Sequence, residues 1–298
     1  MIVGGHVNMK CPICLSKPNE HFSAKYVEVA KCGKCGHNYA FNVPKDHGVQ
    51  ETSDPDVHFA KYGARNQRLI ARWVRDCLIS KGYRVLDFGA GTGHILRSLV
   101  AQVPDLELDI HCIEADKQAS AFLKSQDFVV HEKLSDLNLA SYDAILLVEI
   151  IEHLIYPVDF LKTIQKYLSP TGKMFLTTPI GETRTGNRNL TSYDTAEHVQ
   201  FWTEGSFALA CQKANLVFTP INPSIMYPRK NSLYAVLRDA ARRLRDLFQG
   251  SRHLVGYIHR AQKIVGVGSS EDAIASLETG KQKKNVLSPD RISNPRKT

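Results

Sequence analysis

Two carboxylates and an imidazole follow an apolar run in the stretch "LLVEIIEHLIYP", residues 146–157. If this stretch passes from strand to helix, Glu149, Glu152 and His153 share one helix face, because positions i, i+3 and i+4 are neighbours there. Their like charges repel unless a proton or a cation is shared. Oxygen ligands with one imidazole suit Mg²⁺ or another divalent ion, and His198 offers a fourth ligand farther along the chain.

The same residues also fit a site without metal. A glutamate at this point stabilises the start of a helix through its charge, and a neutral imidazole at His153 or His198 is well suited to act as a general base near pH 7. We therefore expect Glu149, His153 and His198 to be catalytic residues, and both roles for the group of four stay open.

Four cysteines near the N-terminus have the spacing of a metal site. Cys11 and Cys14 form one C-x-x-C pair, and Cys32 and Cys35 form a second pair after a gap of 17 residues. Four thiolates at this spacing are typical of structural zinc, and a redox role is disfavoured because neither pair opens a helix of a βαβ unit. The sequence predicts a zinc ribbon over residues 1–44, with zinc supplying much of its folding free energy.

A glycine-rich turn follows a buried strand in "VLDFGAGTGHIL", residues 85–96. Its pattern is G-x-G-x-G with Asp87 just before it, whereas a dinucleotide fingerprint would need glycine or alanine at His94. An acid is poorly placed beside a pyrophosphate and better placed beside a ligand that carries an ammonium and a sulfonium. Glu114 ends the next strand, where it can accept hydrogen bonds from ribose hydroxyls, and Ala115 is small enough for an adenine ring to lie against it.

The elements that would position these residues alternate between strand and helix. The 298 residues are 43% hydrophobic and 23% charged, as in ordinary globular proteins. Helical spacing over residues 65–80 is followed by strand, turn and helix patterns up to residue 226. This alternation predicts an α/β fold, a doubly wound Rossmann-like sheet over residues 65–226, after a linker over residues 45–64.

With these motifs in this order, the chain resembles the class I S-adenosylmethionine-dependent methyltransferases over about residues 65–220. "VLDFGAGTG" matches their first motif, "CIEAD" stands where their ribose-binding acid stands, and residues 142–179 match their second half. The resemblance implies a sheet with a final antiparallel strand and a bound S-adenosylmethionine. The residues it implies as cofactor contacts are Asp87, Gly89, Ala90, Gly91, Gly93, Glu114 and Ala115.

Within that family, the Glu-x-x-Glu-His pattern with a later histidine is similar to metal-dependent O-methyltransferases of small-RNA 3′ ends and to ubiquinone-pathway O-methyltransferases. This likeness implies that a divalent ion lowers the pKa of a substrate hydroxyl and orients it. The ligands that it implies are Glu149, Glu152, His153 and His198.

Positive charge gathers toward the C-terminus of the chain, whose net charge is +8. Residues 229–263 hold nine Lys/Arg against two Asp, and residues 232–248 combine an apolar stripe with arginines. We expect a basic amphipathic helical extension over residues 227–267, which either packs on the domain or contacts an anionic membrane or nucleic acid, and a disordered tail over residues 268–298.

The sequence carries no apolar run long enough to cross a bilayer and no secretory leader, so the expected location is the cytoplasm, with peripheral contact at the inner face of the membrane as the alternative.

A cysteine ribbon before such a domain also resembles bacterial methyltransferases of sugar and cell-surface polysaccharide pathways. We therefore expect O-methylation or C-methylation of a small-molecule or glycan acceptor. The alternatives are 2′-O-methylation of RNA ribose and O-methylation of a membrane lipid or quinone. A non-enzyme alternative is a zinc-ribbon binding module with an idle methyltransferase fold, which the intact Asp87, glycine turn and Glu114 disfavour.

Overall fold

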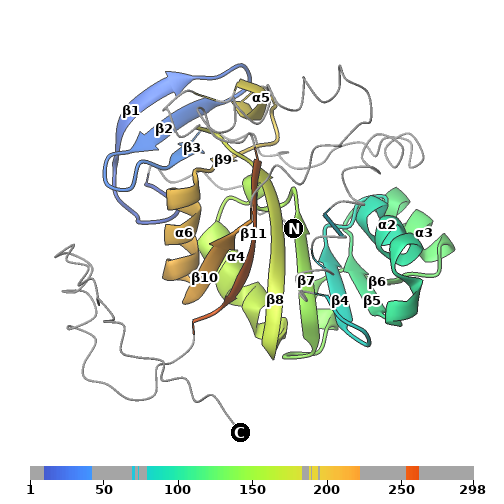
Figure 1. The fold of residues 1–298 in the computed structure, drawn as a ribbon. Helices are drawn as coiled ribbons and strands as arrows, with labels where there is room; N and C mark the ends of the chain where they lie inside the picture. Colours follow the sequence, from blue (N-terminus) through green and yellow to red (C-terminus); the bar gives the residue numbers. More distant parts are fainter. Residues whose placement is uncertain are drawn as a thin grey trace, which may run out of the picture. The chain divides into compact units, whose positions relative to one another are not determined.

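The computed structural model describes residues 10–41, 69–70, 73, 79–182, 188, 190–193, 195–221 and 253–261. Two sheets organise them (Figure 1). The larger has seven strands in the order β10-β11-β8-β7-β4-β5-β6, and the smaller has four in the order β1-β2-β3-β9.

Most strands of the larger sheet run in one direction. The parallel strands are β4 (Arg84–Phe88), β5 (Asp109–Ile113), β6 (Val129–His131), β7 (Tyr142–Val148) and β8 (Leu168–Pro179). Between β8 and β10 (Leu216–Pro220) lies the antiparallel strand β11 (His253–Arg260). The carboxyl ends of the parallel strands therefore share one border, called here the carboxyl edge, where sheets of this type bind ligands. The predicted doubly wound α/β sheet is confirmed.

Helices cover both faces of this sheet. On one face lie α2 (His94–Gln102) and α3 (Lys117–Ser125), and on the other lie α4 (Pro157–Ile164) and α6 (Glu204–Lys213). In β7, Leu146 packs into the core with α2 and α3, whereas Leu147 packs into the core with α4 and α6. Because both faces are buried, β7 reads as a continuous apolar run.

Local chemistry fixes where helices begin. The Asp116 carboxylate accepts a hydrogen bond from the Ala119 amide and caps α3. Thr203 and Ser206 cap α6 reciprocally. The shorter elements are η1 (Pro104–Leu106), η2 (Leu134–Asp136), η3 (Ile151–His153), η4 (Gln165–Tyr167) and α5 (Leu190–Tyr193).

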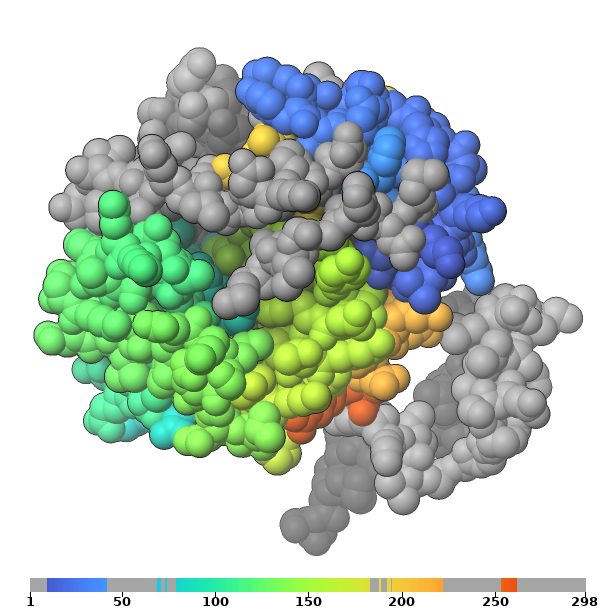
Figure 2. All heavy atoms as spheres, turned by 180° about the vertical axis from the view of Figure 1, so that it is seen from behind, coloured from blue at the N-terminus to red at the C-terminus, as the bar shows by residue number. Residues whose placement is uncertain are grey.

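The smaller sheet is the N-terminal ribbon with one strand added from far along the chain. β1 (Pro18–Ser23), β2 (Glu28–Cys32) and β3 (Asn38–Ala40) form an antiparallel meander, and β9 (Gln200–Phe201) pairs with β3. Seen from behind, the blue ribbon lies against the yellow-green and orange surface that α4 and α6 contribute (Figure 2).

The predicted helical extension over residues 227–267 is wrong for residues 253–260, which form strand β11. Six residues of β11 pair with β8 and five pair with β10, and Val255 and Ile258 are fully buried on opposite faces. The sheet therefore extends to Arg260, past the predicted limit at residue 226. Residues 221–252 connect two neighbouring strands rather than following the domain.

Several sequence-based predictions concern segments that the structure describes only in part or not at all. Leu69, Ile70 and Trp73 are helical and buried, as the spacing over residues 65–80 predicted. The linker over residues 45–64, the amphipathic helix over residues 232–248 and the tail over residues 268–298 lie outside the described residues. Among the helices that the structure describes, none combines the length and apolarity that a membrane crossing requires.

Candidate active site and metal centres

The glycine turn leaves open space at the end of β4. Gly89 and Gly91 both have positive φ, at 71° and 54°, which favours glycine. A Cβ on Gly89 would lie 2.3 Å from Ile150 Cδ1, so that position also requires glycine for packing. A Cβ on Gly91 would meet no atom of the described residues within 4 Å, so these residues leave space for a ligand beside this backbone.

Glu114 lies directly beside this turn, at the end of β5. Its Oε2 accepts a hydrogen bond from the Gly91 amide at 2.6 Å, and its Oε1 accepts one from the Asp116 amide at 2.7 Å. Ala115 is exposed next to it, and Ala90 is buried in the turn. The structure thus brings the predicted ribose acid and the predicted glycine turn together.

Asp87 lies beneath the turn and is 3% exposed. Burial, together with the negative charge of Glu114, raises the pKa of Asp87 to about 7. A positive charge beside Asp87 would stabilise the ionised form of this buried carboxyl group. Two acids on either side of an open glycine backbone fit S-adenosylmethionine, which carries a sulfonium, an ammonium and two ribose hydroxyls.

The next strand end holds Glu149 in an unusual backbone conformation. Glu149 has φ of 56°, rare for a residue with a side chain and typical of functional sites. Its amide donates to the Thr177 carbonyl at 2.8 Å, and its Oε1 accepts from the Thr177 hydroxyl at 2.7 Å. Its Oε2 lies 4.0 Å from His253 Nε2. Glu149 therefore lies at the carboxyl edge, where β7 and β8 end and the antiparallel β11 begins.

A second group gathers just beyond Glu149. Glu152, His153 and His198 each place one potential ligand atom within 4.8 Å of the others. Glu152 is 1% exposed, and its Oε2 accepts a hydrogen bond from the Thr178 hydroxyl at 2.8 Å. An ion with bonds of about 2.1 Å would draw these atoms closer together. The chemistry of this donor set fits a divalent ion.

Backbone carbonyls fix the tautomers of the two histidines. His153 Nδ1 donates to the Glu197 carbonyl at 3.0 Å, and His198 Nδ1 donates to the Ser192 carbonyl at 2.9 Å. A carbonyl oxygen only accepts, so Nε2 is the acceptor nitrogen of each neutral ring. Burial lowers the pKa of His153, which favours that neutral form. Each ring is therefore suited to bind an ion or take up a proton through Nε2.

The predicted group of four is not assembled as one face of a helix. Residues 151–153 form a single 3₁₀ turn, and the positive φ of Glu149 turns the chain before it begins. The i, i+3, i+4 relation consequently does not hold, and Glu149 points to Thr177 and His253 instead of joining Glu152, His153 and His198.

The four ribbon cysteines meet at one point. The Sγ atoms lie 3.6 Å apart for Cys11 and Cys35, 3.4 Å for Cys14 and Cys32, and 3.6 Å for Cys14 and Cys35. Tetrahedral zinc with bonds of ~2.3 Å needs sulfurs about 3.8 Å apart, so the four thiols fit zinc closely. The hydrogen bond with Cys11 lowers the pKa of Cys35, which favours a thiolate there.

A family model described as a methyltransferase domain matches residues 62–220. The chain belongs to this family. The match agrees with the resemblance to class I S-adenosylmethionine-dependent methyltransferases on which the glycine turn was interpreted.

Named relatives of this methyltransferase cover part of the chain. It is 30% identical over 136 residues to the ubiquinone biosynthesis O-methyltransferase of Idiomarina loihiensis, covering 41% of this chain and 51% of the relative. It is 26% identical over 151 residues to that of Burkholderia vietnamiensis, covering 47% and 60%. The chain thus spans less than two thirds of the curated relatives it matches. A solved S-adenosylmethionine-dependent methyltransferase from Archaeoglobus fulgidus is 12% identical, with a TM-score of 0.48 and coverage of 69% of this chain and 99% of that chain.

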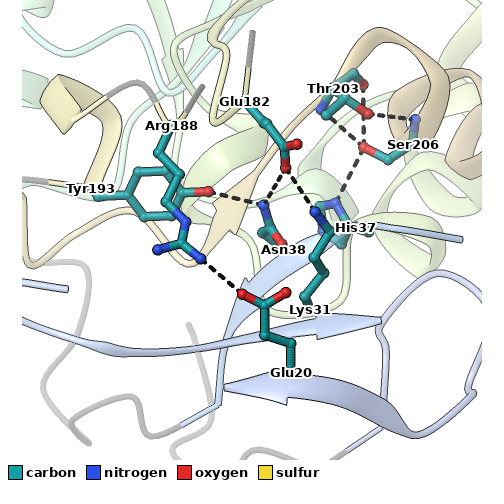
Figure 3. A network of polar contacts seen from close by, with 9 residues as sticks. All are labelled: Glu20, Lys31, His37, Asn38, Glu182, Arg188, Tyr193, Thr203 and Ser206. Carbon is teal, nitrogen blue, oxygen red and sulfur yellow. Dashed lines mark hydrogen bonds and ion pairs between the residues drawn. The ribbon is translucent and has the colours of Figure 1, made fainter. Parts of the chain in front are cut away.

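In this methyltransferase the ribbon and the catalytic domain share a polar interface. His37 is fully buried and hydrogen-bonds Gln200 Oε1 at 2.8 Å and Ser206 Oγ at 3.2 Å. Asn38 donates to Tyr193 Oη at 3.0 Å and to Glu182 Oε2 at 3.2 Å. Figure 3 shows the contacts of His37 with Ser206 and of Asn38 with Tyr193 and Glu182, together with the ion pairs Lys31–Glu182 and Arg188–Glu20.

Sequence reasoning missed His253, which was assigned to a helix, although "HLVGYIHR" contains the β-branched and aromatic residues that favour a strand. Thr177, near the end of β8, is the residue that brings Glu149 into hydrogen-bonding contact with this strand.

Proposed function

We propose that this methyltransferase transfers the methyl group of S-adenosylmethionine to a hydroxyl of a small-molecule or glycan acceptor. The observation that carries the proposal is the grouping of Glu152, His153 and His198 at the carboxyl edge, the edge that also holds the glycine turn. Two imidazoles and a carboxylate suit the activation of a hydroxyl. The names of the curated relatives support O-methylation over C-methylation.

The residues around the glycine turn have separate roles in this proposal. Asp87 favours the positively charged groups of S-adenosylmethionine beside its buried carboxyl group. Glu114 accepts hydrogen bonds from the ribose hydroxyls in place of the bond from the Gly91 amide. Ala115 leaves room for adenine. The full proposed contact set is Asp87, Gly89, Ala90, Gly91, Gly93, Glu114 and Ala115.

Two metal centres belong to the proposal. Zinc is held by Cys11, Cys14, Cys32 and Cys35 and stabilises the ribbon. At the carboxyl edge, Glu152, His153 and His198 hold Mg²⁺ or another divalent ion, which when bound lowers the pKa of the acceptor hydroxyl. The carbonyls of Glu197 and Ser192 keep both rings turned so that Nε2 faces the site.

Transfer of labelled methyl groups into cell extracts tests the proposal. Purified full-length chain, loaded with zinc, is incubated with labelled S-adenosylmethionine and extract, and products are separated into RNA, lipid and soluble fractions. Label in a soluble, hydroxyl-bearing product that disappears with Glu152→Gln supports it. Label confined to RNA contradicts the acceptor class, and no saturable binding of S-adenosylmethionine by calorimetry contradicts the enzyme and favours the idle binding module.

A quinone or lipid phenol is the second candidate acceptor, because both relatives described above are named for ubiquinone biosynthesis. Label in the lipid fraction would select it.

The stretch between β10 and β11 is rich in basic residues. The sheet is left after Pro220 and re-entered at His253, and both residues lie at the carboxyl edge because His253 pairs with Pro179 and Pro220 with Gly256. We propose contact between this segment and an anionic membrane or nucleic acid, tested by flotation with anionic liposomes and by RNA binding at two salt concentrations.

A further inference from the structure

A cavity separate from the carboxyl edge lies between the ribbon and α4. Its volume is about 310 Å³, within the range of small-molecule sites. Ile13, Ile155 and Val158 give it an apolar wall. The lining includes the zinc ligands Cys11 and Cys14 but none of the candidate catalytic or S-adenosylmethionine-binding residues.

The rim of this cavity carries unusually exposed apolar side chains. Leu15 is 70% exposed and Tyr156 is 55% exposed, and both line the cavity. Leu15 has φ of 61° and is held in place by its amide, which donates to the Cys11 carbonyl at 2.9 Å. This backbone conformation holds the Leu15 side chain at the exposed rim. Its apolar surface is removed from water only when a ligand covers the rim.

The charges around the same rim are mainly positive. Lys10, Lys162 and Lys213 line the cavity against one acid, Asp159. Lys162 Nζ lies 3.5 Å from Asp159 Oδ1, so that acid balances one of the three cations, and apart from the zinc ligands Cys11 and Cys14 the lining keeps two uncompensated lysines. Apolar walls with a cationic rim complement a molecule that has an apolar body and an anionic head.

The cavity is joined to the catalytic residues by a short stretch of backbone. Val199 and Gln200 line it, directly after His198. The Val199 amide donates to the Glu152 carbonyl at 2.8 Å, and Gln200 Nε2 donates to the Leu154 carbonyl at 2.8 Å. A ligand in the cavity therefore rests against the segment that carries His198.

We propose that this cavity binds a single-chain amphiphilic anion, with its apolar body between Ile13, Leu15 and Val158 and its phosphate or carboxylate head at the lysines. The site is distinct from the cofactor site, and its occupant packs against the segment of His198. This inference does not depend on which acceptor is methylated.

Calorimetric titration of the zinc-loaded full-length chain with decyl phosphate, below its micelle-forming concentration, tests the proposal. We expect saturable binding of one equivalent, unchanged when S-adenosylhomocysteine is already bound. Inorganic phosphate and decyltrimethylammonium should not saturate, since each lacks one half of the chemistry. Raising salt should weaken binding.

Matched variants locate the site. Lys162→Glu and Leu15→Asn should each weaken decyl phosphate binding at least tenfold, and asparagine tolerates the left-handed conformation at position 15. Lys166→Glu on the adjoining turn and Leu139→Asn, at a leucine 64% exposed elsewhere, should change it less than twofold. Equal effects in both sets, competition by S-adenosylhomocysteine, or equal binding of inorganic phosphate would each overturn the proposal. Thermal melting and zinc content verify folding of every variant.

Discussion

The Gly91 amide donates a 2.6 Å hydrogen bond to Glu114 Oε2, across 23 residues of sequence. This contact ties the turn after β4 to the end of β5, so that the glycine backbone and the acid face the same open space. A charged acceptor and an amide at this distance make a strong hydrogen bond. In the proposed complex, Glu114 would exchange this amide for the ribose hydroxyls of the cofactor.

The first prediction concerns Glu114 itself. Glu114→Gln removes the charge and one acceptor oxygen, and hydrogen bonds to charged groups contribute about 1.5–3 kcal/mol. We expect the dissociation constant for S-adenosylmethionine to rise by about ten- to hundredfold, measured by calorimetry. Glu132→Gln, at an exposed glutamate just after β6, is the control and should leave affinity unchanged. Equal affinity in the two variants would remove Glu114 from the cofactor site.

Asp87 should make the stability of the free protein depend on pH. Its folded pKa of about 7 lies above the ordinary value of 3.8, so between these values the folded state binds more protons than the unfolded state. Stability therefore falls as pH rises through this window. Relative to Asp87→Asn, the free energy of unfolding should drop by about 1 kcal/mol between pH 6 and pH 8.

Urea unfolding at the two pH values measures that drop. The buried His37, whose pKa is lowered to about 4, contributes with the opposite sign, but it is common to both proteins and cancels in the comparison. A difference that stays constant from pH 6 to pH 8 would mean that Asp87 is ionised in the free protein.

The divalent ion should depend on Glu152 and not on Glu149. Glu152→Gln keeps the shape and the contact with Thr178 but removes the charge, so binding of Mn²⁺ by the zinc-loaded protein should weaken at least tenfold, as followed by electron paramagnetic resonance. Glu149→Gln should retain binding, since Glu149 lies outside the trio. Loss of Mn²⁺ in both variants would instead support the four-residue ligand set.

Removal of zinc from the ribbon should impair methyl transfer to the acceptor more than binding of S-adenosylmethionine. The Ala40 amide of β3 donates to the Val199 carbonyl at 2.9 Å, next to His198, whereas Asp87 lies on β4 and Glu114 follows β5, two strands that pair within the larger sheet. Cys32→Ser should release zinc and reduce methyl transfer at least tenfold, while affinity for S-adenosylmethionine changes less than threefold.

Cys211→Ser, at a buried cysteine away from the zinc ligands, is the matched control for that comparison. Zinc release is followed with a chromogenic chelator and cofactor affinity by calorimetry. A parallel loss of cofactor binding would show that the ribbon supports the whole fold rather than the acceptor side.

The packing around two glycines, Gly256 in β11 and Gly205 in α6, predicts opposite effects of substitution by alanine. A Cβ on Gly256 would lie 2.3 Å from Phe218 Cε2 and 2.5 Å from the Thr219 carbonyl oxygen, so Gly256→Ala should destabilise the protein by about 1–3 kcal/mol. Gly205, inside α6, has nothing within 4 Å of such a Cβ, and Gly205→Ala should be neutral or stabilising by up to ~1 kcal/mol. Thermal melting separates them, and equal melting temperatures would contradict the pairing of β11 with β10.

The sequence by itself determined the parts whose chemistry is local. The four cysteines needed only their spacing, because two C-x-x-C turns bring thiols within reach of one zinc. The glycine turn and Glu114 followed from their positions at the ends of consecutive parallel strands, which share an edge in any doubly wound sheet. The apolar run of β7 indicated a strand buried on both faces.

Only the tertiary structure decided the rest. Residues 253–260 can satisfy their backbone groups as helix or strand, and the open edge of β8 selected the strand, which brought His253 to Glu149. The left-handed conformation of Glu149 is accompanied by hydrogen bonds to Thr177 on another strand. No local sequence pattern could therefore predict that Glu149 lies apart from Glu152, His153 and His198. Pairing of β9 with the ribbon likewise joins residues about 160 positions apart, and hydrogen bonds at that separation exist only once the chain has folded.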